Sequence, residues 1–164
     1  MARALIVGCG CRGRELGRDL LAANWAVRGT TRRQESLAAI EESGIEAVVA
    51  NPDRVWTVLE QLEGVTMVFW LLGSASGHPD VLAAIHGPRL ERLLEEIVDT
   101  PVRGFVYEAG GTVEADLLAK GASIVAAAGE RWRIPFALVE ADPDDPGLWR
   151  ADTLAAIVRL LGER

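Results

Sequence analysis

The sequence has few of the residues that disulfide frameworks, metal clusters and membrane spans require. Its 164 residues include two cysteines and two histidines. The longest apolar run, over residues 65–72, is interrupted by Thr66 and falls far short of the ~20 residues that span a bilayer. The opening MARALIV is followed by glycine too soon to resemble a secretion signal. We therefore expect a cytoplasmic protein that does not bind membranes.

Both cysteines, Cys9 and Cys11, lie in one glycine-rich segment near the N-terminus. They have no other cysteine to pair with and stand close together in the chain, which disfavours a disulfide framework. No histidine lies near them, so the sequence predicts no metal site. We interpret them as two small side chains in a crowded loop.

Charge is distributed unevenly along the chain. The formal net charge is −7, which argues against general nucleic-acid binding because the phosphate backbone attracts cationic surfaces. Residues 1–33 nevertheless carry seven arginines against Glu15 and Asp19, a local balance of +5. A basic segment in an otherwise acidic chain indicates a small anionic ligand.

Short apolar runs alternate with longer amphipathic stretches over the whole sequence. Runs rich in Val, Ile and Leu predict strands buried on both faces, and their alternation with helices predicts a doubly wound α/β (Rossmann) fold. We expect one domain over residues 1–164, with six parallel strands in the order 3-2-1-4-5-6. The predicted strands are 4–7, 26–30, 47–50, 66–72, 104–107 and 136–140. The predicted helices are 12–23, 34–43, 53–62, 79–98 with a break at Gly87-Pro88, 113–132 and 148–161.

The motif G-x-G-x-x-G follows the first predicted strand and opens the first predicted helix, which is the context in which it binds dinucleotides. Gly8 permits a tight turn, Gly10 lets a pyrophosphate approach the backbone, and Gly13 lets the helix pack on the sheet. We expect Cys9 and Cys11 of this loop to contact the cofactor as well. The alternative is a glycine-rich turn without a ligand.

The second predicted strand ends in Thr30, Thr31, Arg32 and Arg33, without the acidic residue that binds the ribose of NAD. Hydroxyl and guanidinium groups here suit the 2′-phosphate of NADP, and Arg12 adds a third positive charge. The sequence therefore predicts NADP(H) in preference to NAD(H). Alternatively, the two arginines are solvated residues that begin the next helix.

The segment GCGCRGRELGRDLLAANWAVRGTTRR resembles the N-terminal fingerprint of the extended and atypical short-chain dehydrogenase/reductase superfamily, the epimerase-like NAD(P)-binding proteins. The segments VTMVFWLLGSA, VRGFVYEAGGTV and PFALVEADP are similar to its fourth, fifth and sixth strands. The resemblance implies that Leu72, Gly73 and Ser74 line the cofactor. It also implies dimerisation through the helices around the fifth strand.

The family's catalytic serine and Tyr-x-x-x-Lys motif are only partly matched. The serine position falls on Ala109 or Gly110, and the tyrosine position holds Asp116, four residues before Lys120. An ionised aspartate supplies no proton at neutral pH. Asp116 and Lys120 are thus weak catalytic candidates, and Lys120 is equally interpretable as a solvated helix residue.

Other titratable residues have no role assigned by the sequence. His78 and His86 flank a helix start and a Gly-Pro break, which indicates exposed loop histidines. Glu108 and Glu114 lie near the carboxyl ends of strands, where ligands bind in such folds.

Three functions remain open from the sequence. The first is an NADP-dependent oxidoreductase with an atypical or lost catalytic centre. The second is a non-catalytic module that senses the NADP redox state, and the third, disfavoured by the missing acid, is a regulatory nucleotide domain of the ion-channel type. We also expect a homodimer, because the stretch LLAKGASIVAAAGERW is apolar or small around much of its circumference.

Overall fold

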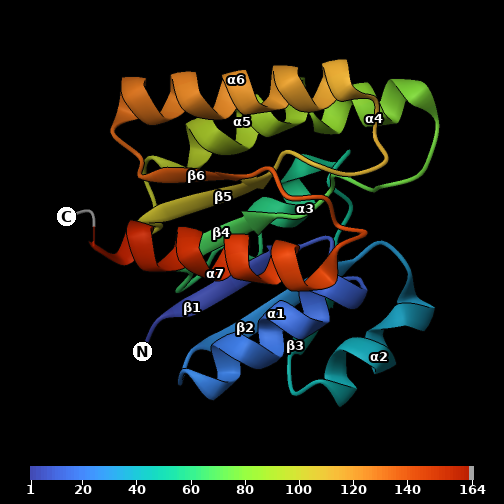
Figure 1. The fold of residues 1–164 in the computed structure, drawn as a ribbon, viewed down its shortest axis with the longest axis vertical. Coiled ribbons are helices and arrows are strands. Elements are labelled where there is room, and N and C mark those ends of the chain that lie inside the picture. The colour runs from blue at the N-terminus through green and yellow to red at the C-terminus, as the bar shows by residue number, and fades with distance from the viewer. Residues whose placement is uncertain (163–164) are drawn as a thin grey trace.

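A six-stranded parallel sheet forms the centre of the computed structural model, which describes residues 1–162 (Figure 1). The strand order is β3-β2-β1-β4-β5-β6, as the sequence predicted. The fold is therefore α/β and Rossmann-like. The strands are β1 Arg3–Val7, β2 Ala26–Thr31, β3 Glu46–Val49, β4 Met67–Trp70, β5 Gly104–Glu108 and β6 Phe136–Val139.

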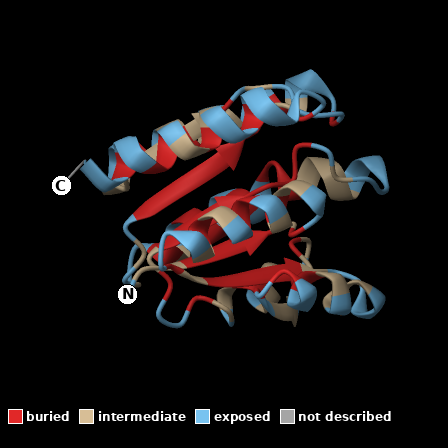
Figure 2. Cartoon of the chain, turned by 60° about the horizontal axis from the view of Figure 1, so that its bottom comes forward, coloured by how far each residue is buried: buried red, intermediate tan, exposed pale blue. Residues whose placement is uncertain are grey.

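Helices cover both faces of this sheet (Figures 1 and 2). One face packs against α1, α2 and α7, and the other packs against α3, α4, α5 and α6. The helices are α1 Cys11–Ala22, α2 Leu37–Glu42 after the 3-10 turn η1 Gln34–Ser36, α3 Val55–Leu59, α4 Pro79–Ile85, α5 Pro88–Ile97, α6 Ala115–Trp132 and α7 Pro146–Gly162.

Successive side chains of the central strands point to opposite faces of the sheet, and this divides the core into two layers. In β1, Ile6 faces the α1 and α7 side while Leu5 and Val7 face the α5 side. All three side chains are fully buried. Burying an aliphatic side chain of this size contributes about 1.5–3 kcal/mol, so both layers stabilise the sheet.

The predicted helix over 79–98 is interrupted where the sequence indicated. Helix α4 ends at Ile85 and α5 begins at Pro88, because proline at the first helical position needs no amide donor. Among residues 1–162, no helix is long and apolar enough to cross a membrane. The same residues contain no group of histidine, cysteine and acidic side chains that could hold a metal ion.

Candidate functional site

A cavity of about 410 Å³ lies at the carboxyl ends of the strands, within the ~300–1,000 Å³ typical of ligand pockets. It spans the point where β1 is flanked by β2 and β4, at which doubly wound folds bind their ligands. Its walls come from the loops after β1, β2, β3 and β4, from α1, η1 and α4, and from the ends of β2 and β5. The residues are Gly8, Cys9, Gly10, Cys11, Arg12, Gly13, Arg14, Thr30, Thr31, Arg32, Arg33, Ser36, Ala50, Asn51, Pro52, Leu71, Leu72, Ser74, Ala75, Ser76, Val81, Ile85 and Glu108.

The first two glycines of the loop after β1 differ in what surrounds them. Gly8 has φ +84°, and a Cβ there would lie 2.5 Å from the carbonyl oxygen of Leu71. A Cβ on Gly10 would meet no described atom within 4 Å, so its backbone borders the open cavity. Gly8 is thus required by the fold, whereas Gly10 leaves room for a ligand to approach the main chain.

Helix α1 begins directly behind this open backbone. Gly10 is its N-cap and supplies no side-chain cap, and the first turn carries no acidic residue. The first N–H groups of a helix have no intrahelical acceptor, and the helix dipole is positive at this end. The wall of the cavity at α1 therefore suits a phosphate group.

The buried side chain of Cys9 fixes the loop against β2. The backbone N–H of Cys9 donates to the carbonyl oxygen of Thr30 at 2.9 Å. The Sγ of Cys9 packs so close to Gly29 that a Cβ on that glycine would lie 2.6 Å from it. Burial raises the pKa of the Cys9 thiol to about 12, so this thiol stays protonated. Cys11 is exposed at the start of α1.

The two threonines that end β2 support the backbone. The buried Thr30 hydroxyl accepts a hydrogen bond from the Gly8 N–H at 3.3 Å, which places it behind the loop as well as beside the cavity. The Thr31 hydroxyl accepts from the Arg33 N–H at 3.1 Å. These bonds fix the glycine loop and the segment of Arg32 and Arg33 relative to the end of β2.

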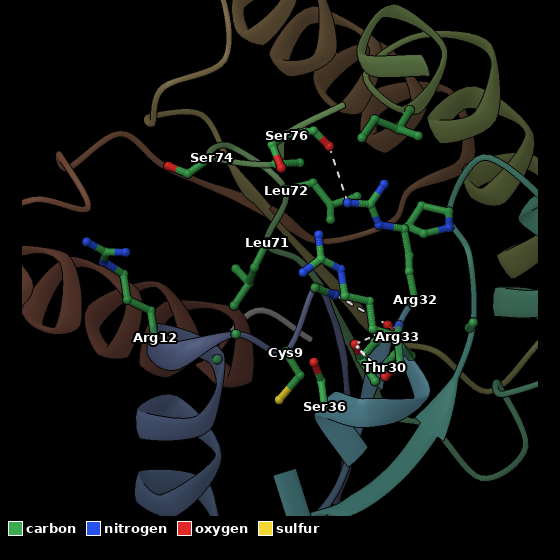
Figure 3. A pocket seen from close by; sticks show the side chains of 18 of the residues that line it. Cys9, Arg12, Thr30, Arg32, Arg33, Ser36, Leu71, Leu72, Ser74 and Ser76 are labelled. Atoms are coloured by element: carbon green, nitrogen blue, oxygen red, sulfur yellow. Dashed lines mark hydrogen bonds between the residues drawn. The ribbon is translucent and has the colours of Figure 1, made fainter. Parts of the chain in front are cut away.

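The arginines after β2 lie at one end of the cavity (Figure 3). Arg32 donates from Nη2 to the carbonyl oxygen of Ser76 at 3.2 Å, across the mouth of the cavity. Arg32 and Arg33 are exposed directly before η1, and neither is paired with an acidic side chain of the described chain.

Arg12 lies at the other side of Leu71 and points away from Arg32 and Arg33 (Figure 3). Its Nη2 is 3.8 Å from the exposed carboxylate of Asp144, and its buried Nε has no hydrogen-bond partner among the described residues. A buried guanidinium N–H without an acceptor is costly, so this group suits an anionic ligand. Arg12, which the sequence suggested as a third positive charge, thus lies apart from Arg32 and Arg33 (Figure 3).

Glu108, at the end of β5, is a buried carboxyl group in the cavity wall. Its Oε1 accepts from the Gly73 N–H at 2.8 Å, and its Oε2 accepts from the Trp149 Nε1–H of α7 at 2.8 Å. Burial raises the pKa of Glu108, and the two donors and nearby Arg12 oppose that shift. The sequence placed Glu108 near the ligand edge without a role.

The turn after β4 packs tightly on the end of β5. A Cβ on Gly73 would clash with the Gly110 carbonyl and lie 2.9 Å from Glu108 Oε1. Gly73 was expected to line the cofactor together with Leu72 and Ser74, but it sits behind the cavity wall and holds Glu108. Leu72 and Ser74 are part of the wall.

His86 is buried, which corrects the expectation of an exposed loop histidine. Its Nε2 is 3.0 Å from the Leu72 carbonyl oxygen, and its Nδ1 is 2.7 Å from the Tyr107 hydroxyl. A carbonyl only accepts, so Nε2 carries the proton and the tyrosine donates to Nδ1. Burial lowers the pKa of His86 and raises that of Tyr107, so both stay neutral. His78 is exposed, and its ring accepts from the Asp80 N–H at the start of α4.

The two weak catalytic candidates lie outside the cavity. Within residues 1–162, neither Asp116 nor Lys120 is part of the wall, and both are exposed on α6. Tyr107, the single tyrosine of the chain, is buried within β5, where its hydroxyl is hydrogen-bonded to His86.

Several wall residues were missed by the sequence interpretation. Asn51 and Pro52 follow β3, and Val81 and Ile85 come from α4. A polar Asn-Pro pair directly after a predicted strand is a signal that identifies the first two. The α4 residues carry no such local signal, because only the path of the chain after β4 brings that helix to the cavity.

Neither the family models nor the curated proteins that were compared match this sequence. Solved structures do match its fold. UDP-glucose 4-epimerase from Thermotoga maritima has a TM-score of 0.70 at 12% identity, covering 84% of this chain and 54% of that one. UDP-glucuronic acid 4-epimerase from Bacillus cereus, in complex with NAD, has a TM-score of 0.65 at 14% identity, covering 84% and 56%.

Triphenylmethane reductase from Citrobacter sp., complexed with NADP(H), matches with a TM-score of 0.63 at 15% identity, covering 85% of this chain and 49% of that one. The chain thus spans about half the length of these three structures. At these identities the likeness establishes the fold. The chain has the fold that its resemblance to the extended short-chain dehydrogenase/reductase superfamily implied.

Proposed function

We propose that the cavity binds NADP(H) and that the chain is the cofactor-binding part of an oxidoreductase. The observation that carries this proposal is the open backbone at Gly10 beside the start of α1, with Arg32 and Arg33 at the end of β2. A pyrophosphate fits the first feature, and a 2′-phosphate fits the second. NADP(H) is the dinucleotide that carries both groups.

The remaining walls suit the other parts of that cofactor. Ala50, directly after β3, and Val81 and Ile85, on α4, give an apolar surface that suits an adenine ring. The buried Nε of Arg12, which has no hydrogen-bond partner within residues 1–162, is available to the pyrophosphate or to the groups beyond it. Leu72 and Ser74 line the part of the cavity beyond β1, where a nicotinamide ring would lie.

The bound nicotinamide would supply or accept a hydride. The chain's own residues bind and orient it, but the positions of the family's serine and tyrosine hold Ala109, Gly110 and Asp116. We therefore propose an atypical proton donor or a lost one. The second candidate, an NADP-sensing module without turnover, is favoured by the exposure of Asp116 and Lys120 outside the cavity.

A thermal-shift titration with NADPH, NADP⁺, NADH and NAD⁺ tests the binding proposal. A ligand that binds only the native state raises its stability by RT ln(1 + [L]/Kd), so the two phosphorylated dinucleotides should raise Tm most at equal concentration. No shift with any of the four would contradict the proposed function.

A further inference from the structure

The two ends of the cavity carry different charged groups. Arg32 and Arg33 mark the end near β2, whereas the wall beyond β1 holds the carboxyl group of Glu108, with Arg12 nearby. If the 2′-phosphate of the adenosine half lies at the arginines, the nicotinamide half must cross the glycine loop toward β4 and β5, because each half of a doubly wound fold holds one nucleotide. Glu108 then stands at the nicotinamide end.

The carboxyl group of Glu108 is unusually placed for a residue with only a packing role. It is 4% exposed, and each oxygen accepts one hydrogen bond, from Gly73 and from Trp149. Within residues 1–162 it forms no ion pair of 4 Å or less. Burying an unpaired carboxylate is costly, and groups held this way in a cavity wall are candidates for function.

We propose that Glu108 discriminates between the two redox states of the bound cofactor, attracting the cationic ring of NADP⁺ and not the neutral ring of NADPH. This inference rests on the proposed dinucleotide binding. The attraction acts inside a cavity wall, where charges interact more strongly than in water. We expect the charge of Glu108 to favour NADP⁺ by on the order of tenfold, equivalent to about 1.4 kcal/mol.

Glu108 also makes this preference depend on pH. Among residues 1–162, the charged group that acts on it is Arg12 from α1, itself near Asp144. Helix α7 contributes the neutral Trp149, and β5 contributes the neutral Tyr107. Burial raises the pKa of Glu108, so a proton and the cationic ring compete for this carboxylate at pH values above those at which carboxyl groups ordinarily titrate. As pH falls, Glu108 is protonated and the preference for NADP⁺ declines. The 2′-phosphate also titrates, near pH 6, but it is common to both cofactors and cancels in their ratio.

The experiment measures Kd for NADP⁺ and NADPH by isothermal titration between pH 5.5 and 9. The wild-type protein is compared with Glu108→Gln and with a matched control, Glu114→Gln, which changes an exposed glutamate outside the cavity wall. In the wild type and the control, Kd(NADPH)/Kd(NADP⁺) should rise as pH rises and, at the alkaline end, exceed the ratio of Glu108→Gln by on the order of tenfold. In Glu108→Gln the ratio should be lower at high pH and independent of pH.

A second measurement uses the unaltered protein, in case Glu108→Gln does not fold. Titrations in buffers of different ionisation enthalpy should show that NADP⁺ binding releases more protons than NADPH binding at the pH where the ratio changes. Equal ratios in wild type and Glu108→Gln at every pH, or equal proton release for the two cofactors in the wild type, would overturn the inference. Binding of neither cofactor would instead refute the proposed function.

Discussion

Arg32 and Ser76 meet across the mouth of the cavity, although they are separated by 44 positions in the chain. The Nη2 of Arg32 donates to the Ser76 carbonyl oxygen at 3.2 Å, joining the segment after β2 to the loop after β4 (Figure 3). The bond is exposed, so it adds little to stability. Its consequence is positional, because it holds one guanidinium at the end of the cavity where a 2′-phosphate is expected.

Replacing Gly10 and Gly8 by alanine should separate binding from folding. Gly10→Ala meets no described atom within 4 Å and has a backbone that alanine adopts, so the free energy of unfolding should hardly change. Its methyl group fills the space through which a pyrophosphate approaches, so affinity for NADPH should fall at least tenfold.

Gly8→Ala is the contrasting variant. Its positive φ alone costs an alanine roughly 1–2 kcal/mol, and its Cβ would lie 2.5 Å from the Leu71 carbonyl oxygen. Urea denaturation should show a clear loss of stability for this variant. Loss of stability in Gly10→Ala, or unchanged NADPH affinity in that variant, would argue against a ligand at the open backbone.

The buried His86 should make the protein sensitive to mild acid. Because burial lowers its pKa, the unfolded chain binds a proton that the native state does not, between that lowered pKa and the ordinary value of 6.5. The free energy of unfolding should therefore fall as pH drops below 6.5, by at most about 1.4 kcal/mol per pH unit. Glu108 has a raised pKa and contributes with the opposite sign, so the test must isolate the histidine.

The contribution of His86 can be isolated by denaturing three proteins at pH 7.5 and at pH 5. These are the wild type, His86→Gln and the exposed control His78→Gln. His86→Gln should be less stable at pH 7.5, because it disturbs the bonds to Leu72 and Tyr107, but should lose less on acidification. His78→Gln should follow the wild type. An unchanged acid dependence in His86→Gln would show that His86 is not held neutral.

Turnover of simple carbonyl compounds with NADPH should be very slow. General acid catalysis contributes about 10²–10⁴-fold, and the family's donor positions lack serine and tyrosine. A carbonyl-reductase screen that follows NADPH absorbance checks this expectation. Rapid NADPH oxidation that is abolished by Asp116→Asn would identify Asp116 as the acid despite its exposure, and loss in Lys120→Ala alone would implicate the lysine.

We expect a homodimer in which α6 contributes to the interface. Its buried residues face α5 and β6, while small side chains such as Ala119, Ser123 and Ala127 remain exposed on the other side. Light scattering at micromolar concentration measures the assembly. A monomer would contradict this expectation, and so would a dimer unaffected by Ala127→Glu.

The sequence predicted the features that are local in the chain. The glycine loop, the absence of an acid after β2 and the break at Gly87-Pro88 each depend on neighbouring residues. The alternation of six apolar runs with helices indicated the doubly wound fold, whose usual strand order the structure has. The contacts that it missed join distant segments. Glu108 meets Trp149 across 41 positions, and His86 meets Tyr107 across 21.

His86 shows why such contacts escape a local interpretation. A histidine before Gly-Pro indicates an exposed loop, but the packing of α4 and β5 turns this one inward onto the Leu72 carbonyl. Arg12 shows the converse. Its position beside Gly13 suggested a third positive charge to accompany Arg32 and Arg33, but its side chain lies on the other side of Leu71 (Figure 3).

The most direct test of the central claim compares NADPH with NADH in wild type and in the double variant Arg32→Ala, Arg33→Ala, with Arg18→Ala as an exposed control on α1. Each charge-assisted bond to a 2′-phosphate is worth about 1.5–3 kcal/mol, so even one corresponds to roughly ten- to hundredfold in affinity. Isothermal titration should show that NADPH affinity falls at least tenfold in the double variant, while NADH affinity and the control hardly change. Equal losses for NADPH and NADH, or no preference for NADPH in the wild type, would contradict the account.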